Sequence, residues 1–536
     1  MALDARKRRR FDSYGDEPEN HEVTLARRLI EIGISLSSER NLDNLLQKIV
    51  DSAIEITNAD GCTLYLTKNM QLHFTVSRNV SLGIAIGGTT GATATFPPVP
   101  MAPTFVSAYA AITRKTVNIP DVYQSDEFDF TGPKKYDERT GYRSVSMLVT
   151  PLLDYQSDVI GVLQILNAKD HETGDVIPFD NKYVGLAKSL ASQAAVAISN
   201  VNLIRETEML FESFVEVMAT ATDARSKYTH GHIRRVAELA LELARAINEE
   251  SDGKPGGAAF SDDELNELRI AAWMHDIGKI VSPTHIMDKS VKLETIFDRS
   301  ELVRTRYELI ISKARAECAV KKAGLCEKGA GREEVDALEK EYENKLAALV
   351  EERNFVISCN NPGEFMEDAK IERLKKIAAG TYELDGKTFP KLTEDELFNL
   401  SIRKGSLTED ERKIMQSHID VTIRMLDKIP FSRKLRNVPL YAGSHHEYLD
   451  GSGYPKGLKA DSMSTQARIL ALVDFFEALT ASDRPYKRQM PMSTVYSILQ
   501  TEVDKGRLDA ELFRILKEKD VYSRFLARIK DKKTAL

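Results

Sequence analysis

The hydrophobic pattern of the chain changes once along its length, and this change limits the folds that the chain can adopt. Short β-rich runs, separated by turn-forming stretches, cover residues 62–67, 71–76, 145–151 and 159–167. Such runs are typical of an antiparallel sheet flanked by helices. From about residue 181 the apolar residues instead recur at helical steps of three and four. The pattern therefore predicts an α+β domain followed by an all-α one.

Length and composition support a folded, multidomain protein. At 536 residues the chain exceeds what one hydrophobic core normally serves, and 42% hydrophobic with 29% charged residues excludes wholesale disorder. The four cysteines form no CxxC pair, and no apolar stretch approaches the ~20 residues needed to cross a bilayer. No signal-peptide core follows the N-terminus. We therefore expect a cytoplasmic protein without a membrane span.

A basic run, Arg6 to Arg10, lies near the start of the chain, and we expect residues 1–22 to form a short disordered tail. The whole chain carries a net charge of -7 and shows no interleaving of basic and aromatic residues. A nucleic acid polymer is therefore not an expected partner.

The first domain begins with a helical pattern over residues 23–57, which the strand-like runs follow. Two segments, Ser146-Met-Leu-Val-Thr-Pro-Leu and Val159-Ile-Gly-Val-Leu-Gln-Ile-Leu-Asn, resemble paired strands of a GAF domain. The resemblance implies that residues 23–180 form a GAF-like sensory domain for an unknown small ligand. GAF domains that bind cyclic nucleotides have a lysine after the asparagine and a later Asp-Glu pair. Here Ala168 follows Asn167 and the acidic pair is missing, so a cyclic nucleotide is not expected.

Residues 181–223 show a helical polarity pattern without proline, and we expect them to form a connecting helix. Their apolar residues step by three and four, or by seven across Glu208. Such a stripe is typical of a coiled-coil seam between two protomers of a homodimer, and equally of a helix packed on its own domain. Both interpretations stay open. The stripe consists of Leu186, Leu190, Ala194, Ala197, Val201, Ile204, Phe211, Val215 and Met218.

The helical part of the chain contains an unusual segment at residues 296–401. Charged helical stretches there, such as residues 332–353, are flanked by loops with Gly, Asn and Pro. We expect a helical insertion, built as a hairpin, that divides an all-α domain into residues 224–295 and 402–525.

Histidine is rare in this chain, yet seven of its ten histidines follow residue 229. His275 and Asp276 adjoin at the end of an apolar helical segment, and Asp474 interrupts another. An unpaired carboxylate is costly to bury, whereas a bound metal removes that difficulty. Imidazole with carboxylate suits Fe, Mn, Zn or Ni better than calcium or magnesium alone, and the lack of nearby cysteine disfavours a structural zinc knot. The sequence therefore predicts a transition-metal site.

Four sequence blocks together resemble the HD-GYP family, over roughly residues 205–525 apart from the insertion. They are Gly231-His-Ile-Arg-Arg-Val, Met274-His-Asp-Ile-Gly-Lys-Ile, His445-His-Glu-Tyr-Leu-Asp-Gly-Ser-Gly-Tyr-Pro-Lys-Gly-Leu and Ala467-Arg-Ile-Leu-Ala-Leu-Val-Asp. The resemblance implies a fold of the HD superfamily with two divalent transition metals, Fe or Mn first and Zn or Ni as alternatives.

The family pattern also implies the ligands. The first metal takes His232, His275, Asp276 and Asp474, and Asp276 bridges to a second metal on His418, His445 and His446. Some members add a glutamate four residues before the first histidine and hold a third metal, but Tyr228 stands there in this chain. The insertion separates His418 from Asp276 by more chain than is usual, and the flanking residues 404–418 restore the register. His230 and His285 match no ligand position.

The function that the resemblance implies is hydrolysis of cyclic di-GMP to pGpG, and in some members on to GMP, under the control of the GAF-like domain. Lys279 matches a lysine that faces the substrate phosphate and, with Asp276, is an expected catalytic residue. Gly453, Tyr454 and Pro455 match the loop tied to cyclic di-GMP recognition. Two alternatives are a phosphohydrolase for another nucleotide, which this loop disfavours, and a catalytically silent adaptor that binds a cyclic dinucleotide, which the complete ligand set disfavours.

Overall fold

The computed structural model of the chain describes residues 21–90, 96–225, 231–250, 259–481 and 490–534. It divides into two compact units, Met1–Phe211 and Glu212–Leu536, each with buried apolar clusters of its own. The basic run at Arg6 to Arg10 lies outside the described residues, as do Tyr228 and His230.

The first unit is built on an antiparallel sheet in the order β3-β2-β1-β7-β6-β5, with β4 paired to β2 and β8 to β7. The four predicted strand runs correspond to β1, β2, β6 and β7, so the predicted antiparallel sheet is confirmed. The strands are β1 (Ala59–Lys68), β2 (Gln71–Asn79), β3 (Ile84–Ile86), β4 (Val99–Pro100), β5 (Val117–Ile119), β6 (Met147–Leu153), β7 (Val159–Lys169) and β8 (Val176–Ile177).

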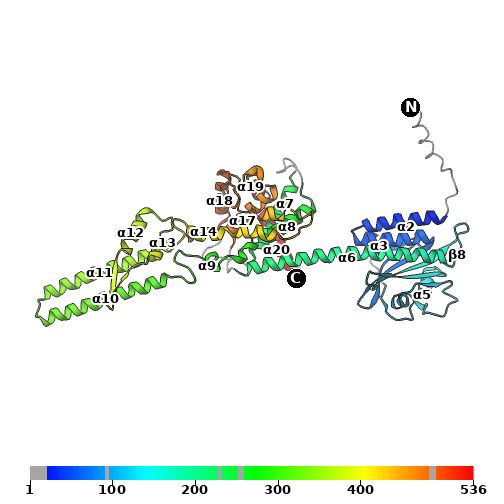
Figure 1. The fold of residues 1–536 in the computed structure, drawn as a ribbon, viewed down its shortest axis with the longest axis horizontal. Coiled ribbons are helices and arrows are strands. Elements are labelled where there is room, and N and C mark those ends of the chain that lie inside the picture. The colour runs from blue at the N-terminus through cyan, green and yellow to red at the C-terminus, as the bar shows by residue number, and fades with distance from the viewer. Residues whose placement is uncertain (1–20, 91–95, 226–230, 251–258, 482–489, 535–536) are drawn as a thin grey trace, which may run out of the picture. The chain divides into compact units, whose positions relative to one another are not determined.

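Helices cover both faces of this sheet (Figure 1). They are α2 (His21–Ser38), α3 (Leu42–Thr57), α4 (Val106–Thr113), α5 (Thr131–Thr140) and α6 (Asn181–Asp223). The face with Leu64 and Leu163 packs against α2, α3 and the first part of α6. Side chains alternate along a strand, so the next residues, Tyr65 and Val162, point to the other face and pack with α4. The two faces therefore bury separate cores.

The helical pattern over residues 23–57 corresponds to two helices instead of one. Asn41 precedes α3 with extended backbone, and its side chain accepts a hydrogen bond of 3.0 Å from the backbone amide of Asn44. This is an N-cap, which satisfies one of the free amides at a helix start. It begins α3 as a new helix after the break that follows α2.

The α6 helix covers the range over which the polarity pattern predicts a connecting helix. Its first apolar residues, among them Leu190, Ala194, Ala197 and Val201, are buried in the core of the first unit. The expected coiled-coil seam is thus, up to Val201, a stripe that packs on its own domain. The predicted GAF-like domain, residues 23–180, ends before these residues, which belong to its core.

The second unit is helical, as predicted, except for one short hairpin that the sequence analysis missed. Strands β9 (Thr381–Leu384) and β10 (Lys387–Pro390) pair antiparallel around Asp385 and Gly386, both with positive φ. Asp-Gly between two short runs is a hairpin signal, so the sequence did carry this information. No helix of the described residues is both long and apolar enough to cross a membrane.

The helices on either side of the expected insertion form the all-α body of this unit. They are α7 (His232–Asn248), α8 (Asp262–Met274), η2 (Ile277–Val281), α9 (Thr284–Met287), α14 (Glu409–Gln416), α15 (His418–Leu426), α16 (Val438–Ala442), η3 (Ala460–Ser462), α17 (Thr465–Thr480), α18 (Met492–Asp504), α19 (Ala510–Glu518) and α20 (Val521–Thr534).

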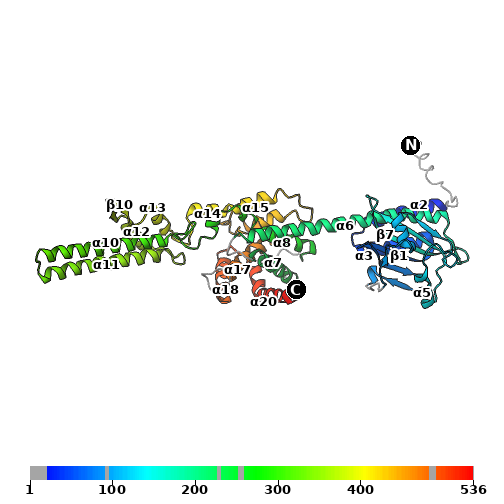
Figure 2. The same ribbon diagram turned by 90° about the horizontal axis from the view of Figure 1, so that it is seen from below.

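The segment expected as an insertion has its own core. Its helices are α10 (Ser300–Glu327), α11 (Arg332–Cys359), α12 (Asp368–Ala378) and α13 (Glu394–Leu400). The α10 and α11 helices lie side by side in both views (Figures 1 and 2), with Ile311 and Leu349 buried between them. Val303, Val356 and Leu374 belong to a second buried cluster at the other end of the segment.

Two buried lysines hold the beginning and the end of this segment together. Lys289 donates to Asn399 Oδ1 (3.0 Å) and pairs with Glu411 (2.8 Å). Lys292, fully buried, donates to the carbonyl oxygens of Leu400 (3.3 Å) and Ile402 (2.7 Å). Because these contacts join the two ends, α9 and α14 lie close together in space although a long stretch of chain separates them in sequence.

Candidate metal centre

All seven predicted ligands lie in one part of the second unit, and most of them stand at helix ends. His232 is the first residue of α7, His275 and Asp276 directly follow α8, and His418 begins α15. His445 and His446 follow α16, while Asp474 lies within α17. A helix end changes the direction of the backbone, so adjacent residues there can turn towards one point. The fold thus draws these residues together from five helices.

Three of the histidines are oriented in the same way. The Nδ1 atoms of His275, His418 and His445 donate to the carbonyl oxygens three residues earlier, at 2.7, 2.5 and 2.6 Å. This leaves each Nε2 as the atom with a free lone pair. All three Nε2 atoms are buried and have no hydrogen-bond partner within the part of the chain that the structure describes. Buried nitrogens without partners are rare in folded proteins and call for an explanation.

Asp276 lies between two groups of histidines. Its Oδ2 is 3.6 Å from His232 Nε2 and 3.3 Å from His275 Nε2. Its Oδ1, which is buried without a hydrogen-bond partner, is 3.4 Å from His418 Nε2 and 3.8 Å from His445 Nε2. The two oxygens of one carboxylate therefore face different pairs of imidazoles.

Asp474 and His446 complete the two groups. Asp474 Oδ1 is 3.2 Å from His232 Nε2 and 3.8 Å from His275 Nε2. The ring of His446 stacks at an angle on that of His445, with centroids 4.2 Å apart, and lies 5.5 Å from that of His418. Candidate ligand atoms lie within 4.8 Å of one another in each of two sets, His232 with His275 and Asp276, and His418 with His445 and His446.

The electrostatics of the two groups differ. Burial opposes protonation of His232, but Asp276, Asp474 and Glu477 outweigh it and raise the pKa of that imidazole well above its usual value. Burial lowers the pKa of His446 to about 4 and that of His445 well below its ordinary range. These last two histidines therefore stay neutral, which is the form that binds a metal.

A metal centre requires nitrogen and oxygen atoms that converge on one point and are not used in hydrogen bonds. The imidazoles and carboxylates of this cluster provide such atoms, so the residues present fit the implied metals. A cluster of this composition without cations would leave buried lone pairs facing each other, which is unfavourable.

Glu477 supports His232 and was missed by the sequence analysis. Its Oε2 pairs with His232 Nδ1, and its Oε1 accepts from Arg235 Nε at 2.5 Å. A carboxylate on the second ring nitrogen fixes the orientation of a ligating histidine. Glu477 is 2% exposed and stands three residues after Asp474, on the same face of α17. That spacing is the signal from which it could have been predicted.

Close backbone packing brings His418 to the cluster. A Cβ on Gly278 would lie 1.9 Å from the carbonyl oxygen of His418, so only glycine allows η2 and α15 to approach this closely. Thr422, also on α15, accepts from the Gly278 amide at 2.9 Å and donates to the His275 carbonyl at 3.2 Å. The glycine of the His-Asp-Ile-Gly-Lys block thus joins segments that lie far apart in sequence.

The Gly453-Tyr454-Pro455 loop lies directly beside His446. The Tyr454 ring is 4.9 Å from the His446 ring, centroid to centroid, and the Tyr454 amide donates to the His446 carbonyl at 3.2 Å. A Cβ on Gly453 would lie 2.3 Å from the Tyr448 amide nitrogen, so no larger residue fits. Buried Glu447 accepts from the amides of Lys456 (2.7 Å) and Leu458 (2.9 Å), which fixes the loop.

Lys279 lies beside the candidate metal ligands, whereas His285 does not. Lys279 Nζ lies 2.5 Å from Asp276 Oδ2, at the edge of the cluster. Burial opposes its protonation, but the charges of Asp276 and Asp474 raise its pKa, so it carries a positive charge there. His285 is exposed on α9 and lies outside both ligand groups.

Family models match both units. A GAF domain model matches residues 41–198, and HD domain models match residues 229–351 and 386–512. Both HD matches extend into residues 296–401, so the bounds of the insertion stay a prediction.

Several curated proteins are similar to part of this chain. The chain is 39% identical over 114 residues to the "3'3'-cGAMP-specific phosphodiesterase 1" of Vibrio cholerae, with 21% of this chain and 26% of the relative covered. It is 30% identical over 189 residues, 33% of this chain and 47% of the relative, to the "Cyclic di-GMP phosphodiesterase response regulator RpfG" of Xanthomonas campestris. A "Cyclic di-GMP phosphodiesterase" of Thermotoga maritima is 35% identical over 100 residues, 19% of this chain and 27% of the relative. The chain spans less than half the length of each relative.

Among solved structures, the GAF domain of an Acinetobacter phosphoenolpyruvate-protein phosphotransferase aligns with 16% identity over 34% of this chain and 98% of its own. The TM-score is 0.26, which is too low for the likeness to carry an argument.

Proposed function

Since the chain carries a GAF domain followed by an HD domain, we propose that it is a metal-dependent phosphodiesterase that hydrolyses a cyclic dinucleotide. The observation that carries this proposal is the carboxylate of Asp276, whose two oxygens face separate pairs of histidines. A carboxylate placed in this way suits a bridge between two cations, and paired cations are a common solution for phosphodiester cleavage.

In this proposal the chain holds two divalent transition metals, with Fe or Mn favoured over Zn or Ni. When bound, the metals supply an activated water and positive charge for the phosphate oxygens. The first position takes His232, His275, Asp276 and Asp474, and the second takes Asp276, His418, His445 and His446. Glu477 holds the His232 ring in the orientation that points Nε2 at the first position.

Two parts of the chain are proposed to bind substrate. Lys279, charged and at the edge of the cluster, binds a nonbridging oxygen of the reacting phosphate and stabilises the charge that develops there. Gly453, Tyr454 and Pro455 form the second part, because the loop is fixed against His446 and presents a half-buried aromatic ring beside the cluster. An aromatic ring at this place suits stacking on a nucleobase.

Cyclic di-GMP is the proposed substrate, with pGpG as first product and GMP as a further one. The name of the Vibrio cholerae relative makes 3'3'-cGAMP the second candidate. The test is to purify the chain without oxygen, measure its metal content and incubate it with cyclic di-GMP, 3'3'-cGAMP and cyclic di-AMP. Faster hydrolysis of cyclic di-GMP than of the other two supports cyclic di-GMP as the substrate. Faster hydrolysis of 3'3'-cGAMP makes 3'3'-cGAMP the substrate instead. A fully metallated chain that cleaves none of them contradicts the enzymatic function and favours the silent adaptor.

Regulation by the GAF domain in a homodimer is a further part of the proposal. On α6, large apolar residues that the first core does not bury recur every seven positions: Val196, Leu203, Leu210 and Val217, each between 49% and 72% exposed. A seven-residue repeat is typical of a two-stranded coiled coil, so the occupant of this stripe is the same helix of a second copy.

Paired lysine substitutions test the seam. Leu203→Lys together with Leu210→Lys should convert the dimer to a monomer in light scattering and change turnover with cyclic di-GMP. Ile34→Lys, at a residue on α2 that is 66% exposed, is the matched control and should keep the mass of the unaltered protein. A monomeric unaltered protein, or a double variant with unchanged mass, contradicts the seam.

A further inference from the structure

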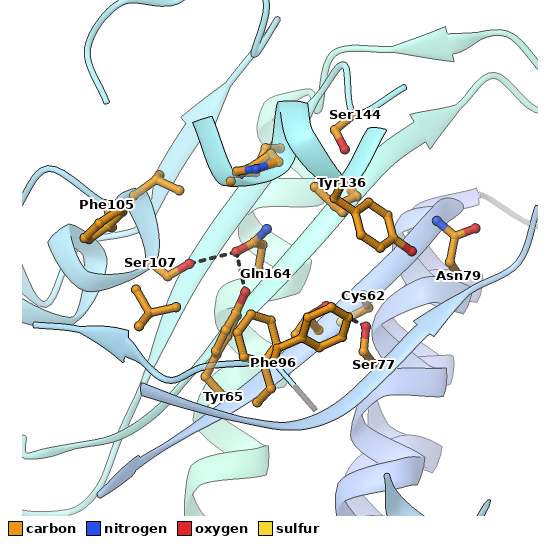
Figure 3. A pocket seen from close by; sticks show the side chains of 18 of the residues that line it. Cys62, Tyr65, Ser77, Asn79, Phe96, Phe105, Ser107, Tyr136, Ser144 and Gln164 are labelled. Atoms are coloured by element: carbon orange, nitrogen blue, oxygen red, sulfur yellow. Dashed lines mark hydrogen bonds between the residues drawn. The ribbon is translucent and has the colours of Figure 1, made fainter. Parts of the chain in front are cut away.

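The first unit contains a cavity of about 590 Å³ on the face of the sheet opposite α2 and α3. Its floor comes from β1, β2 and β7, and its walls come from residues 96–100, the start of α4 and one side of α5. Figure 3 shows labelled side chains from these elements converging on one space. A cavity of this size accommodates an organic ligand of moderate mass.

The walls of the cavity are mainly apolar and rigid. Six aromatic residues line it, and two pairs of their rings are in contact: Tyr65 with Phe74, centroids 4.6 Å apart, and Phe74 with Phe96, 5.1 Å apart. Four of the lining residues are prolines, which restrict the backbone of residues 97–100 and of the first turn of α5. The aromatic residues are Tyr65, Phe74, Phe96, Phe105, Phe130 and Tyr136. Ring faces on several sides suit a flat aromatic guest, because offset and edge-on contacts between rings are both favourable.

Gln164 is one of the buried polar residues that line this mainly apolar space. Gln164, 8% exposed, lies on β7 between Val162 and Leu166, which point to the same face. Its Oε1 accepts from the hydroxyls of Ser107 (2.7 Å) and Tyr65 (3.1 Å), which fixes the amide. Figure 3 shows the amide nitrogen turned away from both hydroxyls. That nitrogen has no hydrogen-bond partner among the described residues, so its two N–H groups are left for a ligand atom.

The charges around the cavity do not favour an anion. Arg78 is already paired with Asp51. Asp129 and Arg139, the other two charged residues of the wall, are exposed and opposite in sign. A phosphorylated ligand needs cations or several free amide donors, and this wall offers no net positive charge.

We propose that this cavity binds an uncharged, flat aromatic molecule whose hydrogen-bond acceptor meets the Gln164 amide nitrogen. The apolar body of the ligand fills the space between the aromatic rings, and its carbonyl or ring nitrogen accepts from Gln164. This site is separate from the metal centre and does not depend on the reaction proposed for it.

Matched probes test the proposal on the full chain by calorimetric titration. The probes are 9-fluorenone, fluorene, which replaces the carbonyl by CH2, and 9-fluorenone-4-carboxylate, which adds a charge. Fluorenone should bind at a single site about tenfold more tightly than fluorene, since a net hydrogen bond contributes about one decade. The carboxylate should bind more weakly than fluorenone.

A variant locates the binding. Gln164→Leu should remove the preference for fluorenone over fluorene while fluorene still binds. Thr150→Val, at a buried residue of β6 outside the cavity, is the matched control and should keep the preference. The proposal is overturned if fluorenone shows no saturable binding, if the three probes bind alike, or if Gln164→Leu keeps the preference. The comparison of probes on the unaltered chain stands even where the variant fails to fold.

Discussion

The metal centre and the cavity of the first unit are opposite kinds of site. In the candidate metal centre seven imidazole and carboxylate groups converge, five of them buried, and four of their atoms lack a hydrogen-bond partner among the described residues. In the cavity, mainly apolar side chains surround the buried amide of Gln164, whose nitrogen has no hydrogen-bond partner among the described residues. One site is made of groups that water would otherwise solvate, and the other of groups that water avoids.

This difference decides how much each residue matters. A buried charge without its counterpart costs several kcal/mol, so the members of the metal centre depend on one another. Contacts in an apolar cavity are individually small and additive, so a single polar change there has a modest effect. We therefore expect substitutions in the candidate metal centre to have larger effects than substitutions in the cavity.

Asp276→Asn should have the largest effect, because an amide is a poor bridge between two cations. Loss of several kcal/mol of charge stabilisation corresponds to ~10³-fold slower hydrolysis. Elemental analysis should show reduced occupancy at both positions. Asp461→Asn, at an exposed residue of η3, is the control and should keep both metals and turnover. Two metals retained by Asp276→Asn would contradict the bridge.

Lys279→Ala should slow hydrolysis of cyclic di-GMP by ~100-fold, the typical effect of removing one electrostatic contact to a reacting oxygen. Metal content should stay near that of the unaltered protein, because Lys279 holds a substrate oxygen in this proposal and no metal. Single-turnover kinetics with measured metal content checks both. Unchanged turnover would remove Lys279 from the mechanism.

Glu477→Gln should weaken binding of the first metal by ~10- to 100-fold, since the partner of a ligating histidine sets its orientation and basicity. Competitive titration with a chelator measures this affinity without reference to activity. The matched control is Glu242→Gln on α7, a carboxylate that is also buried but pairs with Arg245 and Arg528. Equal metal affinities in the two variants would mean that Glu477 is only a structural ion pair.

Tyr65→Phe should have the smallest effect. It removes one of two hydroxyls that donate to Gln164 Oε1, and Ser107 keeps the other contact. The expected loss of stability is ~1 kcal/mol, read from the urea unfolding midpoint of the first unit. A loss of stability of several kcal/mol, as expected for an unpaired buried charge, would contradict the proposed difference between the two sites.

Much of the metal centre could be predicted from the sequence because its chemistry resides in a few residue types. Histidine is rare in this chain, and His275 with Asp276, or Asp474 in an apolar helix, stands out without knowledge of the fold. The cavity could not be found in this way. Phe74, Phe96 and Gln164 are ordinary strand and loop residues, and only their convergence in space makes a site.

What the sequence by itself determined is local: the strand runs of the first unit, the helical second half and the candidate ligand residues with their spacing. The tertiary structure decided which apolar stripe of α6 is buried, that Glu477 supports His232, and that Lys289 and Lys292 bring His418 back towards Asp276 across a long stretch of chain. The physical reason is that periodicity and residue type depend on neighbours along the chain. Burial and partnership depend instead on segments far away in sequence, which meet only when the whole unit packs.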